Sequence, residues 1–140
     1  MLLFENEVAK IDLNVDNNSL TITWKEIVFK QDYEEVWKQA WNFASPYDVT
    51  EFLSDETRLL SVAGDGLDWV MKKWEPLCAK RLGLTRKIAF VLSPGFDENL
   101  QEQNRVQEVG SLMNEFIFKQ FNNMQEAEGW LYSREATLMV

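Results

Sequence analysis

The stretch KIAFVL, residues 87–92, decides the fold of this 140-residue sequence. Apolar residues run without interruption from 88 to 92, and Ser93-Pro94-Gly95 ends the run. A short continuous apolar run beside turn residues is typical of a strand that is buried on both faces of a parallel sheet. We therefore predict that residues 88–92 form the innermost strand of a central β layer covered by helices.

Strand and helix patterns precede this run. Residues 8–15 and 20–24 alternate apolar and polar side chains, and Asp16-Asn17-Asn18-Ser19 between them is typical of a turn. The two segments are predicted to form an antiparallel hairpin. Residues 31–44 carry apolar side chains at helical spacing, and residues 49–54 form a further short strand.

Helices and strands alternate through the rest of the chain. Residues 64–82 are predicted to form a helix that Pro76 bends, and residues 99–113 another helix. Residues 116–121 form the last strand, before a helix that Asn122 caps and that ends near residue 131. The expected order is β-β-α-β-α-β-α-β-α, an α/β fold with a mixed, mostly parallel sheet. Residues 1–133 are expected to form one domain, and residues 134–140 a C-terminal tail.

The composition limits the classes of function. The formal net charge of −9 opposes binding to nucleic acid and to anionic membranes. No apolar run approaches the roughly 20 residues of a membrane-spanning helix, the start of the chain does not read as a signal peptide, and Cys78 stands alone. A cytoplasmic location is therefore expected. Because the chain has no histidine, we expect no metal site, no cofactor and no enzymatic activity.

Trp69 is the first candidate binding residue. On an α-helical wheel of residues 64–82, Trp74 faces the sheet with the apolar residues, whereas Trp69 lies among lysines on the opposite face. A ring in that position suits contact with a protein partner, with a second copy of the chain, or with a small anionic or apolar ligand. The alternative is that Trp69 packs on its own chain.

Charged residues supply the other candidates. Basic residues gather between 72 and 87, among them Lys72, Lys73 and Lys80, and this cluster either holds an anion or acidic partner or is a solvated helix face. Asp55 and Arg58 follow the strand at 49–54, at the kind of strand end where α/β sheets often bind ligands. For Asp55 and Arg58 the alternative is a structural pair that braces the loop.

Several motifs occur in an order that resembles the SpoIIAA-like, STAS-related bacterial proteins of uncharacterised function. They are Trp-x4-Trp-x-Pro at 69–76, Gly83-Leu84, Lys-x-Ala-x-Val at 87–91 and Glu-Ala-x-x-Trp-Leu at 126–131, with Phe-Leu-Ser-Asp at 52–55 before Arg58. The likeness spans residues 8–132. It implies the SpoIIAA-like fold, which STAS domains share with CRAL-TRIO lipid-transfer domains.

The resemblance does not imply one activity, since fold is not function. Anti-sigma-factor antagonists of this fold carry an Asp-Ser-Ser-Gly-like phosphoacceptor at a helix start. This chain has Leu60-Ser61-Val62-Ala63-Gly64 there, so Ser61 is either a phosphoacceptor by position or a turn residue.

We expect a non-catalytic regulatory or protein-interaction module, with a homodimer as one form of that role. The alternative is a small-molecule or lipid carrier with an apolar pocket between the sheet and its helices. An enzyme that uses carboxylates or a lysine is the third hypothesis.

Overall fold

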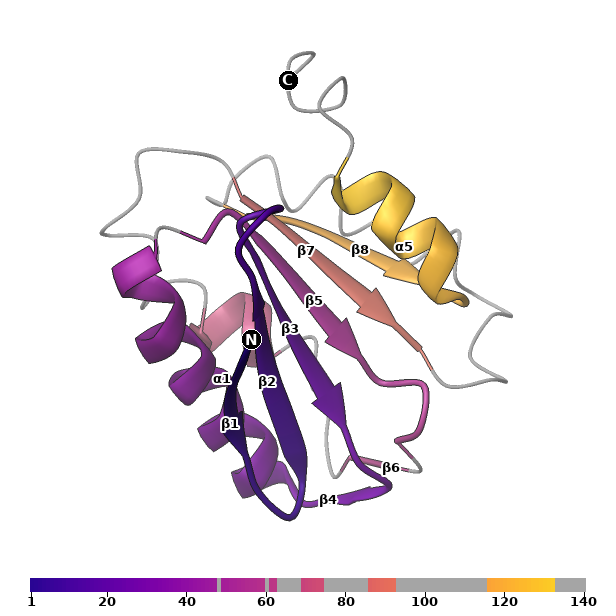
Figure 1. Cartoon of the computed structure of the whole chain (residues 1–140). Helices are drawn as coiled ribbons and strands as arrows, with labels where there is room; N and C mark the ends of the chain where they lie inside the picture. Colours follow the sequence, from indigo (N-terminus) through magenta and orange to yellow (C-terminus); the bar gives the residue numbers. More distant parts are fainter. Residues whose placement is uncertain (48, 60, 63–68, 75–85, 93–115, 133–140) are drawn as a thin grey trace.

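The computed structural model describes residues 1–47, 49–59, 61–62, 69–74, 86–92 and 116–132. Within these residues a six-stranded sheet has the order β1-β2-β3-β5-β7-β8 (Figure 1). A second, two-stranded sheet pairs β4 with β6. None of the helices in the described ranges has the length and apolar character needed to span a bilayer.

The large sheet is mixed and mostly parallel, as predicted. An antiparallel meander is followed by parallel strands; the strands are β1 (Leu2–Glu5), β2 (Ala9–Asn14), β3 (Ser19–Trp24), β5 (Glu51–Asp55), β7 (Arg86–Val91) and β8 (Phe116–Phe121). The predicted hairpin is confirmed, with Ile11 opposite Ile22. Asn18 in its turn has a φ of 53°, a conformation that asparagine tolerates. The sequence pattern did not predict β1, which pairs with β2 through an irregular register.

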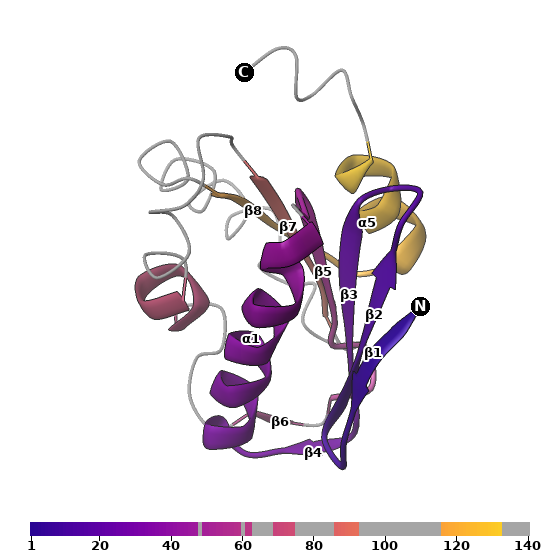
Figure 2. The same cartoon turned by 60° about the vertical axis from the view of Figure 1, so that its left-hand side comes forward.

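Two apolar cores lie on opposite faces of this sheet. Helix α1 (Lys30–Ala44), followed by the short η1 (Ser45–Tyr47), covers one face, and α5 (Met124–Leu131) covers part of the other (Figure 2). Strand alternation sends Phe52 and Phe90 toward α1, and Leu53 and Val91 toward α5. The buried stripe of α1 matches the predicted one: Tyr33, Val36, Trp37, Ala40 and Ala44.

Strand β7, which contains residues 88–91 of the apolar run, is buried as predicted, but it is not the central strand of the sheet. Ile88, Ala89, Phe90 and Val91 are all 0% exposed. β7 nevertheless lies between β5 and the edge strand β8, and the middle strands are β3 and β5. A continuous apolar run therefore indicates that helices cover both faces of a strand, whatever its position in the sheet.

The segment predicted as a helix at 64–82 is described only at 69–74, where η2 (Val70–Trp74) is a π-helix. Its i→i+5 hydrogen bonds bring residues five apart onto one side. Trp69 accordingly packs against the same core as Trp74, and it is half-buried. The prediction that Trp69 faces away from the core is wrong, because the wheel assumed α-helical geometry.

Ser61 lies in a strand and not at a helix start. β6 (Ser61–Val62) pairs in parallel with β4 (Ile27–Val28), and Ser61 is opposite Ile27. The predicted placement of Ser61 at a helix start is wrong, because the backbone of β4 offers a strand partner that the local sequence does not reveal. A phosphoacceptor role for Ser61 stays a prediction.

At the last helix, Asn123 and not Asn122 is the N-cap, and its side chain accepts a hydrogen bond from the Glu126 N–H at 2.8 Å. The predicted helix at 99–113, the bend at Pro76, Lys80 and the tail at 134–140 lie outside the described residues.

Candidate functional site

The structure separates the two residues predicted at the end of β5. The Asp55 carboxylate accepts hydrogen bonds from the backbone N–H and the hydroxyl of Thr57, at 3.1 and 2.6 Å. Arg58 is exposed, and neither ion pair found within the described residues involves it or Asp55. Asp55 therefore shapes a local turn, and the predicted Asp55–Arg58 brace is wrong.

A polar cluster lies at this carboxyl edge of the parallel strands, around Glu56. One carboxyl oxygen of Glu56, Oε2, accepts hydrogen bonds from the Tyr33 phenol at 2.6 Å and from the Ser54 hydroxyl at 2.9 Å. Ser54 in turn accepts a hydrogen bond from the Trp24 indole N–H at 2.8 Å. Donors from three elements of the fold thus connect to a single carboxyl group.

The alternation of side chains along β5 and the stacking of two aromatic rings place the members of the cluster. Ser54 is in the row of β5 that faces α1, and Glu56 continues that row just beyond the strand. Tyr33, in the first turn of α1, stacks on Trp24 with ring centroids 4.5 Å apart. The Glu56 N–H donates to the Val91 carbonyl at 2.8 Å, which ties the turn to β7.

The surroundings change the protonation of the cluster. Burial raises the pKa of Glu56 to about 7, although the hydrogen bonds from Tyr33 and Ser54 lower it, and the charge of Asp55 raises it further. Burial and the charge of Glu56 raise the pKa of Tyr33 well above its usual value, so this phenol stays protonated and donates. The carboxyl of Glu56 therefore changes charge near neutral pH, where an ordinary glutamate is fully ionised.

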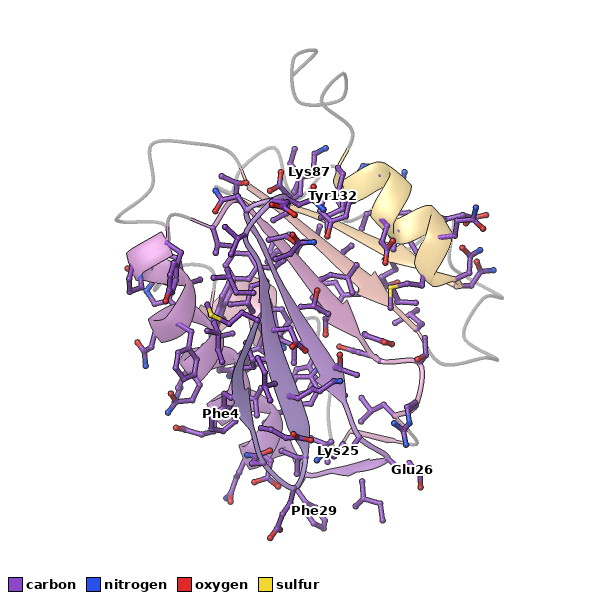
Figure 3. All side chains as sticks on the ribbon, viewed as in Figure 1. Phe4, Lys25, Glu26, Phe29, Lys87 and Tyr132 are labelled. Carbon is purple, nitrogen blue, oxygen red and sulfur yellow. The ribbon has the colours of Figure 1, made fainter. Side chains whose placement is uncertain are left out.

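Two large apolar side chains are exposed beside this cluster, on the segment that leads from β4 into α1. Ile27 and Phe29 are 68% and 67% exposed, whereas Val28 between them is 3% exposed. In extended backbone, residues two apart project to the same side, so Ile27 and Phe29 face solvent together. Figure 3 shows Phe29 near Lys25 and Glu26, at one end of the molecule. We call Ile27, Phe29 and the first turn of α1 the β4 corner.

Phe29 stabilises neither the core nor the helix that it begins. It is the N-cap of α1, with φ −83° and ψ 159°, and its side chain makes no capping hydrogen bond. Serine, threonine, aspartate and asparagine are the residues that stabilise this position. The ring of Phe29 therefore adds apolar surface to the β4 corner.

The opposite end of the sheet holds a structural cluster around Lys87. Lys87 is 5% exposed, donates to the Trp130 carbonyl at 3.1 Å and lies 5.3 Å from the centroid of the Trp130 ring. Burial lowers the pKa of Lys87, and the charge of Glu51 raises it. A cation at the C-terminal end of α5 satisfies a terminal carbonyl and the helix dipole. Figure 3 shows Lys87 and Tyr132 together, at the end opposite Phe29.

The predicted basic patch is therefore divided. Lys87 belongs to the α5 contact and does not face solvent, whereas Lys73 is exposed. Lys80 and the side chain of Lys72 lie outside the described residues. A role for Lys72, Lys73 and Lys80 in binding stays a prediction.

Two open depressions lie in the described surface. Their volumes are about 550 and 680 Å³, and acidic residues contribute to both linings, among them Asp12 and Asp32. They do not supply the apolar pocket that a lipid carrier requires. Within the described ranges, no group of three or more carboxylates or thiols gathers as a set of metal ligands.

Comparison with known proteins identifies the fold. No family model matches the chain, and no curated protein matches it. The structure is similar to the crystal structure of an uncharacterised DUF3478-family protein with a SpoIIAA-like fold from Shewanella loihica PV-4. The TM-score is 0.51 at 17% sequence identity, over 92% of this chain and 98% of the other. The SpoIIAA-like α/β fold expected from the motifs is confirmed, and this likeness shows the fold alone.

Proposed function

We propose that this chain is a non-catalytic protein-interaction module that binds a protein partner through the β4 corner. The observation that carries the proposal is the joint exposure of Ile27 and Phe29 on one side of an extended segment. Burying a side chain of this size contributes about 1.5–3 kcal/mol, so two of them can anchor a small interface.

The composition supports a regulatory partner of protein type. A net charge of −9 disfavours nucleic acid and anionic lipid as partners, and the chain lacks histidine, the commonest catalytic base. The single cysteine suits a reducing cytoplasm. The bacterial source of the similar structure supports a bacterial setting. A second copy of the chain is the first partner to test.

Photo-crosslinking in the native cell tests the proposal. Benzoylphenylalanine at position 29 keeps an aromatic side chain at the corner, and the same group at Tyr47, 48% exposed beyond the other end of α1, is the matched control. We expect a discrete crosslinked species from position 29, absent from position 47 and weakened by Ile27→Ser. A product of twice the chain mass would identify a homodimer. Equal crosslinking from both positions, or none from position 29, would contradict the proposal.

A further inference from the structure

One of the two depressions lies beside the β4 corner. Its volume is about 680 Å³, and its lining includes Lys25, just before β4, and Asp32, in the first turn of α1. The turn between β1 and β2 supplies the rest of the lining, residues 5–8. Because two of the lining residues flank Ile27 and Phe29 along the chain, a molecule that enters the depression can also contact both exposed side chains.

The surface around this depression is acidic. Both lysines of the segment 25–30 are in ion pairs: the Lys25 ammonium lies 3.3 Å from the Glu5 carboxylate, and that of Lys30 lies 4.0 Å from Glu34. The acids of this surface that take part in neither ion pair are Glu7, Glu26 and Asp32. Each lysine therefore balances one acid, and the remaining acids make the surface negative. Complementary charge favours the docking of a basic partner.

The outer edge of β4 can accept a further strand. β4 pairs in parallel with β6, and no other strand within the described ranges pairs with it. In both views β4 runs along the border of the molecule, with β6 on its inner side (Figures 1 and 2). An edge strand presents backbone N–H and C=O groups to an incoming strand. β1, at the edge of the large sheet, has an irregular register, which opposes such pairing.

We propose that the partner docks on the β4 corner with an extended, basic segment, which adds as a strand to the outer edge of β4. The inference rests on the proposed function, and adds the chemistry of the partner and the mode of contact. Apolar side chains of the segment lie beside Ile27 and Phe29, because side chains of paired strands are neighbours on one face. Its Lys or Arg side chains face the surrounding acids. The partner is a different protein, since two copies of an acidic corner repel each other.

Fluorescence anisotropy with a labelled synthetic peptide tests the chemistry of the segment. The probe is Lys-Val-Lys-Val-Lys-Val-Lys, titrated with the full chain, and the matched peptide carries Glu in place of each Lys. We expect saturable binding of the basic peptide, and binding of the acidic peptide that is weaker by at least about tenfold. No binding of the basic peptide, or equal binding of the two, would overturn the inference.

Charge-reversal variants test whether the peptide binds at the corner. Glu7→Lys combined with Glu26→Lys reverses two exposed acids there and should weaken binding by about tenfold. Asp16→Lys combined with Glu128→Lys is the matched control, because it makes the same change of net charge in the β2–β3 turn and on α5. The control should bind the peptide within about twofold of the wild type, since screening limits the reach of exposed charges. Equal weakening in both variants would overturn the inference.

Hydrogen exchange of the peptide complex tests strand addition. Amides in residues 26–29 should exchange at least about tenfold more slowly in the complex, because an added strand supplies them with acceptors. Residues 2–5, at the edge of the large sheet, are the internal comparison and should change little. Protection of residues 2–5 in place of residues 26–29, or no protection of either, would overturn the proposed mode of contact.

The two proposals fail separately. Crosslinking from position 29 in the native cell tests the proposed function, and no crosslink would contradict it whatever the peptide does. Where a crosslink forms, Glu7→Lys with Glu26→Lys should lower its yield, and the control variant should not. A yield that does not respond to these charges, or a product of twice the chain mass, would overturn the basic segment and leave the docking surface intact.

Discussion

Phe29 has two properties that each reduce the stability of the folded monomer. Its ring is 67% exposed, and it occupies an N-cap position without supplying a capping oxygen. A polar side chain here would satisfy a free N–H of the first helical turn. The sequence contains a capping residue nearby in Asp32, but Asp32 lies inside the first turn and not at the cap. Phenylalanine at this position therefore leaves a stabilising cap unused.

Replacing Phe29 with serine should separate stability from binding. Serine can cap α1, so the free energy of unfolding should rise by about 1 kcal/mol in urea denaturation. The same change should remove binding through the corner. Phe29→Ala is the matched control, because it removes the ring without supplying a cap. A loss of stability in Phe29→Ser would show that the ring packs on the protein and would weaken the docking argument.

The alternation of side chains along β5 could have indicated Glu56 as a member of the polar cluster. Asp55 and Arg58 are charged and follow a strand, but the Asp55 carboxylate accepts its hydrogen bonds within its own turn. Every second residue of a strand faces the same side. Phe52 and Ser54 of β5 face α1, and Glu56, two residues further on, continues this row beyond the end of the strand. Two polar residues, Ser54 and Glu56, in a row of side chains that otherwise faces the core are the sequence feature that indicates this cluster. Tyr33, which donates a hydrogen bond to Glu56, belongs to α1, and the sequence does not predict where α1 packs on the sheet.

At the scale of the element, the π-helix η2 explains the error at Trp69. An α-helical wheel places residues five apart on different faces, whereas one turn of π-helix aligns them. Trp69 and Trp74 then contact the same core, where Trp74 also donates to the Trp37 carbonyl at 2.6 Å. Local sequence gives no reliable sign of such a turn, because packing against α1 determines it.

Trp69→Ala should therefore act on stability. A half-buried indole that packs on the core contributes about 2 kcal/mol to folding, and its removal should lower the midpoint of urea denaturation accordingly. Lys73→Ala, in the same turn but exposed, should change stability by less than about 0.5 kcal/mol. An undiminished stability of Trp69→Ala would contradict a packing role for this ring. A binding role for Trp69 stays a prediction.

The strands that the pattern did not predict are short or lie at an edge. β1 has exposed and half-buried residues without clear alternation, and β4 and β6 are two residues long. By contrast, β2, β3, β7 and β8 carry strong period-two or continuous apolar patterns. The periodicity of apolar residues reflects which side chains are buried. Strands that bury few side chains therefore cannot be predicted from it.

Two motifs of the SpoIIAA-like resemblance meet in the structure. Lys87 from Lys-x-Ala-x-Val contacts Trp130 from Glu-Ala-x-x-Trp-Leu through a carbonyl and a ring. Ser19 and Tyr132 add a hydroxyl contact of 3.0 Å that links the end of α5 to β3. These motifs therefore fix α5 on the sheet, and their match indicates the fold without indicating an activity.

At the scale of the whole molecule, the layered α/β architecture could be predicted and the candidate site could not. The hairpin, α1, β5, β7, β8 and α5 all follow from local periodicity. The site depends on long-range contacts: Tyr33 and Glu56 are 23 residues apart, and Trp24 and Ser54 are 30 apart. Sheet order also brings β3 beside β5, which no local pattern specifies.

Burial of Glu56 also links the stability of the whole molecule to pH. Its raised pKa means that folding takes up a proton between the ordinary value, 4.5, and about 7. The stabilising contribution of the carboxyl is thus complete at acid pH and disappears as pH rises through 7. The remaining acids add their own pH dependence, so only a comparison with Glu56→Gln isolates this carboxyl.

Equilibrium urea unfolding of the wild type and Glu56→Gln at pH 5 and pH 8 tests most directly whether the half-buried carboxyl of Glu56 joins α1 to the end of β5. The two proteins should be about equally stable at pH 5. At pH 8 the wild type should be less stable than the variant by about 1–3 kcal/mol, because only the wild type must hold a charge in the desolvated cluster around Glu56. A stability difference that is the same at both pH values would contradict the account.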